Sequence, residues 1–327
     1  MTVGPLGIGG VIDRAVAVAR LHFRPLFVAM LLLQAPALAL ARLASAELPS
    51  LLQLASDATL AAERAPLALA AAAGLLVTLF LLQNLALTVT AAILAPALGG
   101  ATDDQPGAPG PAWSRLVPGA LATGLAQQLL LVLAAGVGMV PGLLLLLTAR
   151  SAATTLGGAI SAAVGGLVLF LVALLRTILA PVAVGVERLG PWSALRCSSR
   201  LMAPRPGQPA LERPGVRASL LILTTFALVL AVNGLAGVPR AVAGSLAGGG
   251  LLPFLPGALP LPVELALTAF ELAAGAALQP FSLAVTVVFY FERRARTEGL
   301  DLQAWAASLG STSSPAPLAA PTTEAAR

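Results

Sequence analysis

The chain has 327 residues, of which 58% are hydrophobic and only 10% are charged. Soluble globular proteins carry about 25% charged residues, so this composition excludes an ordinary soluble globule and indicates a protein that lies in lipid. All 19 basic residues are arginine, and with 14 acidic residues they give a net charge of +5. The lack of lysine excludes Schiff-base chemistry and a lysine-containing phosphate loop, and the single Cys197 excludes an intrachain disulfide.

Residues 1–24 are predicted to form an amphipathic helix that lies at the membrane surface. Their apolar side chains recur at helical spacing and share one face, whereas Asp13, Arg20 and Arg24 share another. A cleavable signal peptide is the alternative, because basic residues, an apolar run and small residues at 44–46 follow one another. The long, patterned region before the apolar run favours the surface helix.

Six stretches are long and apolar enough to cross a hydrocarbon core about 30 Å thick, which takes about 20 helical residues. They lie at residues 25–43, 66–98, 117–148, 156–186, 218–238 and 261–291. The runs are continuous and lack the alternation of a barrel strand, and lipid requires backbone hydrogen bonds to close within each segment. The predicted fold is therefore all-α, a polytopic helical bundle in which residues 25–298 form a six-helix transmembrane domain.

The connection between the fourth and fifth spans begins with a second amphipathic unit. Trp192 and Leu195 fall on one side of the predicted helix, and Arg196 and Arg200 fall on another. Four prolines between residues 204 and 214 then predict a loop, because proline lacks a backbone donor and clashes with the preceding helical turn.

Arginine is distributed unevenly between the two sides of the membrane. Fourteen arginines fall in the terminal regions and in the connections after the second and fourth spans, whereas the opposite side holds only Arg42, Arg64, Arg150 and Arg240. The positive-inside rule then predicts that both termini are cytoplasmic. We expect a multi-pass protein of the bacterial cytoplasmic membrane, with a cytoplasmic tail at residues 299–327 that is disordered after about residue 310.

Charged side chains within a span are costly in lipid and normally face protein or water. Arg176 lies ten residues before the end of the fourth span, and Glu271 lies ten residues after the start of the sixth. At about 1.5 Å per residue both lie about 15 Å deep, so we predict that they form an ion pair inside the bundle. The alternative is that Arg176 extends to the interface while Glu271 is protonated or binds backbone or water.

Uncharged polar and small residues within the spans are predicted to hold the helices together. Interhelical hydrogen bonds between amide side chains contribute about 0.6 kcal/mol each, and the candidates are Gln83, Asn84, Gln127, Gln128, Asn233 and Gln279. Gly157, Ser161 and Gly165 recur every four residues, a spacing that lets two helix backbones approach closely. Packing within the chain is favoured over dimer formation for this stripe.

Three parts of the chain carry longer motifs: IDRA at 12–15 with LHFRPL at 21–26, ERLGP at 187–191 with ALR and SSRL at 194–201, and FYFERRARTEGLDL at 289–302. Together they resemble the bacterial family labelled glycerophosphoryl diester phosphodiesterase membrane domain. The resemblance implies the membrane part only. Hydrolysis by the soluble phosphodiesterase relies on histidines and a carboxylate-bound metal, whereas this chain has only His22, so we expect no catalytic domain. The proline-rich insertion after Met202 departs from the family pattern.

No combination of residues in the sequence indicates catalysis, a cofactor or a metal site. A serine nucleophile needs a base within reach, and His22 is the only histidine. We therefore expect a non-enzymatic scaffold or an accessory subunit of a membrane complex. The alternative is a permease or lipid-handling transporter, which charges within spans and proline-broken helices favour. The expected partners are the bilayer and either anionic headgroups or a protein, not nucleic acid, with candidate contacts at Arg20, Arg24, Arg196, Arg200, Arg293 and Arg294.

Overall fold

The computed structural model describes residues 7–56, 58–99, 113–204, 207–246 and 259–298, in which all regular secondary structure is helical. In chain order the elements are α1 (Ile8–Leu21), α2 (Phe23–Ser56), α3 (Ala58–Leu94), η1 (Pro96–Leu98), α4 (Trp113–Thr148), α5 (Ala152–Thr177), α6 (Ala180–Glu187), α7 (Pro191–Leu201), η2 (Ala210–Glu212), α8 (Pro214–Leu246) and α9 (Leu261–Glu298). The tail predicted for residues 299–327 lies outside the described residues.

Within the described ranges, six segments are long and apolar enough to cross a membrane, and each overlaps one of the predicted spans. They are Phe23–Leu40, Ala70–Leu94, Leu116–Thr148, Ala152–Glu187, Pro214–Ser245 and Leu261–Thr297. The prediction of an all-α, multi-pass membrane bundle is confirmed.

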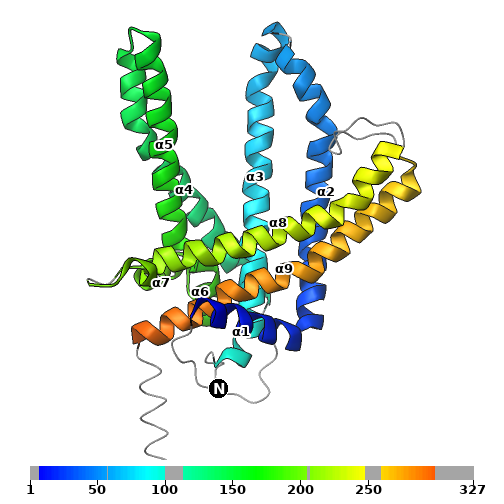
Figure 1. Cartoon of the computed structure of the whole chain (residues 1–327), viewed down its shortest axis with the longest axis vertical. Coiled ribbons are helices and arrows are strands. Elements are labelled where there is room, and N and C mark those ends of the chain that lie inside the picture. Colours follow the sequence, from blue (N-terminus) through cyan, green and yellow to red (C-terminus); the bar gives the residue numbers. More distant parts are fainter. Residues whose placement is uncertain (1–6, 57, 100–112, 205–206, 247–258, 299–327) are drawn as a thin grey trace, which may run out of the picture.

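The long helices pair into three hairpins, α2–α3, α4–α5 and α8–α9, which spread from a common end (Figure 1). Helix α9 also packs against α1, α2 and α3. The common end contains α1, α6, α7 and residues 285–298 of α9, at the bottom of Figure 1, and we call it the base. The turns of the α2–α3 and α4–α5 hairpins lie at the opposite end.

The largest apolar core fills the base. Every residue of α6 from Ala180 to Val186 is buried, and α6 packs against α3, α4 and α7. Farther from the base, large apolar side chains such as Leu129, Val168 and Phe226 are exposed on α4, α5 and α8. A bilayer covers surfaces of this kind, since lipid tails are as apolar as the side chains themselves.

The fourth span is divided into two helices, which the sequence did not predict. Helix α5 ends at Thr177 and α6 begins at Ala180, with Pro181 in its first turn. Ser198 of α7 fills the break, because its hydroxyl donates to the Arg176 carbonyl at 2.8 Å and accepts from the Leu179 amide at 3.2 Å. These two bonds satisfy backbone groups that a broken helix leaves without partners.

Helices α4 and α5 pack closely along their small residues. A Cβ added to Gly138 would lie 2.2 Å from the Gly165 carbonyl oxygen, and one added to Gly142 would lie 2.0 Å from the Ala162 nitrogen. The predicted packing stripe is therefore right at Gly165. It is wrong at Gly157, where an added Cβ meets nothing within 4 Å, whereas Gly158, Ala162 and Gly166 on the neighbouring stripe of α5 are buried.

A helix forms in each of the two regions predicted to be amphipathic, and each packs its apolar face on the core of the base. The first helix spans only residues 8–21 of the predicted 1–24, since Arg24 belongs to α2 and residues 1–6 lie outside the described residues. Helix α1 buries Val11 and Ala15 and leaves Arg20 exposed. Helix α7 buries Leu195, but Trp192 is 65% exposed and does not join the buried face. The proline-rich stretch after α7 contains only the short helix η2 among its described residues.

Candidate functional site

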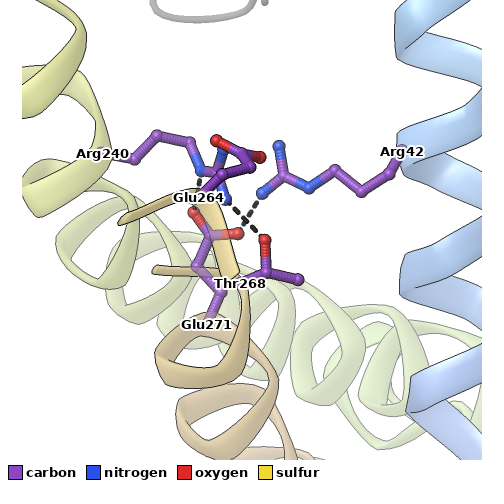
Figure 2. Close-up of polar contacts among 5 residues, drawn as sticks. All are labelled: Arg42, Arg240, Glu264, Thr268 and Glu271. Carbon is purple, nitrogen blue, oxygen red and sulfur yellow. Dashed lines mark hydrogen bonds and ion pairs between the residues drawn. The ribbon is translucent and has the colours of Figure 1, made fainter. Parts of the chain in front are cut away.

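Charged side chains from three helices meet where the end of the α8–α9 hairpin that lies away from the base reaches the middle part of α2 (Figure 1). Arg240 of α8 donates from Nε to Glu271 Oε1 at 2.7 Å and from Nη1 to Glu264 Oε1 at 2.5 Å, both on α9. Its Nη2 donates to Thr268 Oγ1 at 2.8 Å. Arg42 of α2 donates to the second carboxylate oxygen of Glu271, so Glu271 bridges two arginines (Figure 2).

The sequence of α9 explains how one arginine reaches three partners. Glu264, Thr268 and Glu271 follow one another at four and three residues, a spacing that places their side chains on one face of a helix. Two arginines and two glutamates make the network neutral as a set. Such pairing offsets much of the cost of placing charge within membrane-spanning helices.

A groove of about 510 Å3 extends from this network between α2, α3, α8 and α9. Gln279 of α9 lies at its centre, accepting from Gln34 of α2 and donating to Gln83 of α3 at 2.7 Å. An added Cβ at Gly275 would lie 2.7 Å from Gln34 Oε1, so a larger residue there would displace the Gln34 side chain. Asn233 of α8 completes the polar lining and is exposed.

The remaining groove wall is apolar, with Leu38, Val229 and Leu278 among its lining residues. A lining that combines amides and a carboxylate with aliphatic side chains is suited to an amphiphile, because the polar and the apolar part of such a molecule each find matching groups. Among the described residues, no three His, Cys, Asp or Glu side chains gather as metal ligands do.

The predicted pair between Arg176 and Glu271 is wrong. Both Glu271 oxygens are engaged by Arg42 and Arg240, whereas exposed Arg176 lines a different groove between α5 and α8. The depth argument failed because the fourth span breaks after Thr177 and folds into the base. Arg176 is therefore close to α7, and its carbonyl accepts from Ser198.

Two arginines that the sequence assigned to headgroup contacts have partners within the base. Arg293 is 2% exposed and donates from both Nε and Nη2 to the Leu201 carbonyl, at 3.1 and 2.9 Å, which satisfies the C-terminal end of α7. Arg294 pairs with Glu187 at 3.0 Å. Four of the predicted contacts are exposed: Arg20, Arg24, Arg196 and Arg200.

The base also holds a buried ion pair between α8 and α9. Arg217 Nη1 lies 2.9 Å from Glu292 Oε1, and the two side chains are 6% and 0% exposed. Arg296, one turn after Glu292, contacts the same carboxylate oxygen. Nearby, burial and the Glu187 carboxylate raise the pKa of the Cys197 thiol, so Cys197 is a weak nucleophile at neutral pH.

The sequence analysis identified part of the polar site. Gln83, Asn233 and Gln279 were predicted as interhelical contacts, and all three line the groove, where Gln83 bonds Gln279. Gln127 bonds Thr177 Oγ1 at 3.1 Å elsewhere, as a contact between α4 and α5. Gln34 was missed, although an amide within an apolar run is the signal that could have found it.

No family model, no curated protein and no solved structure matches the chain. The resemblance to the phosphodiesterase membrane domain therefore stays a prediction. Residues from two of its motifs contact one another in the base, since Tyr290 donates to Glu187. These motif residues hold the base together.

Proposed function

We propose that this protein is a lipid-handling membrane protein that binds the polar part of an amphiphile in the groove between α2, α3, α8 and α9. The observation that supports this is an amide- and carboxylate-lined groove within helices long and apolar enough to span a membrane. Polar side chains at such a position are costly unless they have protein or ligand partners. The proposed role is binding and movement of lipid, without covalent chemistry.

Replacing Asn233 with leucine tests this function. Asn233 is exposed in the groove, and no hydrogen bond of its side chain is found among the described residues, so the change removes a ligand contact with little expected effect on folding. We expect binding of a fluorescent phospholipid to weaken about tenfold, as the loss of one or two hydrogen bonds predicts. Titration of the purified protein in detergent gives the dissociation constant.

Thr224→Val is the matched control, because Thr224 is exposed on the same helix and donates only to the Leu220 carbonyl of its own helix. It should bind the lipid as the wild type does. Lipid movement between leaflets of reconstituted vesicles should fall with Asn233→Leu. Equal binding by wild type and Asn233→Leu would reject the groove as the lipid site.

A scaffold or accessory subunit is the second candidate, and a surface on the base favours it. Trp192 is 65% exposed beside exposed Arg196 and Arg200, and all three line a shallow depression on α7. Aromatic and arginine side chains are enriched in protein interfaces. Native mass spectrometry after gentle extraction separates the two functions, since it detects either bound lipid or a partner protein.

We also propose that the protein lies in a bacterial cytoplasmic membrane with the base on the cytoplasmic side. The excess of arginine in the regions that form and flank the base supports this orientation. Reporters fused after Met202 and after Arg296 should score as cytoplasmic, and one fused after Ser56 should score as external. A cytoplasmic score after Ser56 would contradict the orientation, and cleavage after Ala46 would support the signal-peptide alternative.

A further inference from the structure

A second groove, separate from the polar one, lies between α5, the end of α7 and the start of α8. Its volume is about 460 Å3, within the usual range of about 300 to 1,000 Å3 for small-molecule sites. Arg176 and Arg213 line it, and both are exposed. The rest of its lining is largely apolar and includes Val172 on α5 and Leu223 on α8.

The two arginines lie at the end of the groove nearest the base, and apolar residues line it farther along α5 and α8. Arg176 is in the last turn of α5, and Arg213 directly precedes α8, so both positive charges lie where these helices meet the base. Val172 lies one turn before Arg176 on α5. Leu223 lies nine residues into α8, about 14 Å along its axis. The groove therefore changes from cationic at the base to apolar toward the middle of the spans.

Among the residues that the structure describes, no carboxylate lines this groove. Glu212 precedes Arg213 in the chain but is not among the lining residues. The two guanidinium groups are therefore positioned to bind an anion, and arginine is suited to phosphate oxygens because its donors form a planar fork. An anion with an apolar chain would satisfy both ends of the groove at once.

We propose that this groove binds one anionic phospholipid, with its phosphate at Arg176 and Arg213 and an acyl chain along α5 and α8. Val172 and Leu223 are 44% and 63% exposed, so the chain would lie on surface that the protein itself does not cover. Gly215 provides room beside Arg213, because a Cβ added there meets nothing within 4 Å. The site differs in its residues and its charge from the polar groove of the proposed function.

The test compares two double variants by native mass spectrometry with titrated phosphatidylglycerol and phosphatidylcholine. Wild type should retain phosphatidylglycerol in preference to phosphatidylcholine. Removing both groove charges by Arg176→Gln with Arg213→Gln should weaken phosphatidylglycerol binding about 30-fold, about fivefold for each arginine. The control is Arg150→Gln with Arg188→Gln, which removes the same charge from two exposed positions outside this groove, and should keep the preference.

Gly215→Leu tests the acyl part without changing charge. The added side chain would occupy the groove, so phosphatidylglycerol binding should fall while inorganic phosphate has no competing effect. The proposal is overturned if wild type shows no preference for phosphatidylglycerol, or if both double variants lose binding equally. It is also overturned if Gly215→Leu binds as wild type does, or if inorganic phosphate at the same concentration as the lipid displaces it. If only Asn233→Leu loses bound lipid, that loss concerns the polar groove of the proposed function. It does not contradict the lipid site at Arg176 and Arg213.

Discussion

Glu292→Gln lowers the free energy of unfolding by about 3 kcal/mol, the usual loss when one partner of a buried ion pair is removed. Glu292 is fully buried and bonds Arg217, itself only 6% exposed. The glutamine side chain keeps the size of the carboxylate but not its charge, so the buried guanidinium loses the anion that compensates it. Denaturant-induced unfolding of the purified protein in detergent micelles measures the change.

Glu212→Gln is the control, because it is the same substitution at an exposed glutamate next to α8. It should change stability by less than about 0.5 kcal/mol, as surface substitutions do. If Glu292→Gln is as stable as this control, the ion pair does not hold α8 to the base.

Gly142→Ala should be the second strongly destabilising change, with an expected loss of about 2 kcal/mol. The new methyl group would lie 2.0 Å from the Ala162 nitrogen, so the backbones of α4 and α5 must separate. Overfilling a well-packed interface typically costs about 1 to 3 kcal/mol. Thermal unfolding in detergent, followed by circular dichroism, gives the comparison with wild type.

Gly136→Ala provides a control on the same helix, since a Cβ at Gly136 meets nothing within 4 Å. Alanine is also the better helix former, by about 1 kcal/mol, so this variant should match or exceed the stability of wild type. Equal behaviour of the two alanine variants would mean that α4 and α5 are not held at the distance that the structure shows.

The sequence predicted the six spans because their signal is local: a long apolar run needs no knowledge of its neighbours. The α1 and α7 helices followed from helical periodicity for the same reason. Periodicity does not say which surface a side chain meets, and Arg293 shows the limit. It was assigned to headgroups because it lies in a basic run, yet it is buried against the end of α7.

The polar site could be predicted only in part, because it depends on how the α2–α3 and α8–α9 hairpins lie against one another. Arg42 and Arg240 were counted among the few charges on the side of the membrane opposite the arginine-rich one, and nothing in their sequence neighbourhood connects them with Glu271. The error at Arg176 has a different cause. Depth was counted along a straight fourth span, and the chain breaks at 178–179. Pro181 in the sequence could have indicated a helix break there. Ser198, whose hydroxyl bonds the open backbone groups of the break, lies on another helix.

The serine-filled break also constrains the order in which the protein is made. Ser198 follows Leu179 by 19 residues, so the ribosome synthesises α5 and α6 before the side chain that pairs their open backbone groups exists. Domains and their elements form progressively during synthesis, and an unpaired amide or carbonyl is costly in hydrocarbon. The open backbone groups of the fourth span therefore gain these partners only after α7 has been synthesised, which makes the completed fold of α5 and α6 depend on α7.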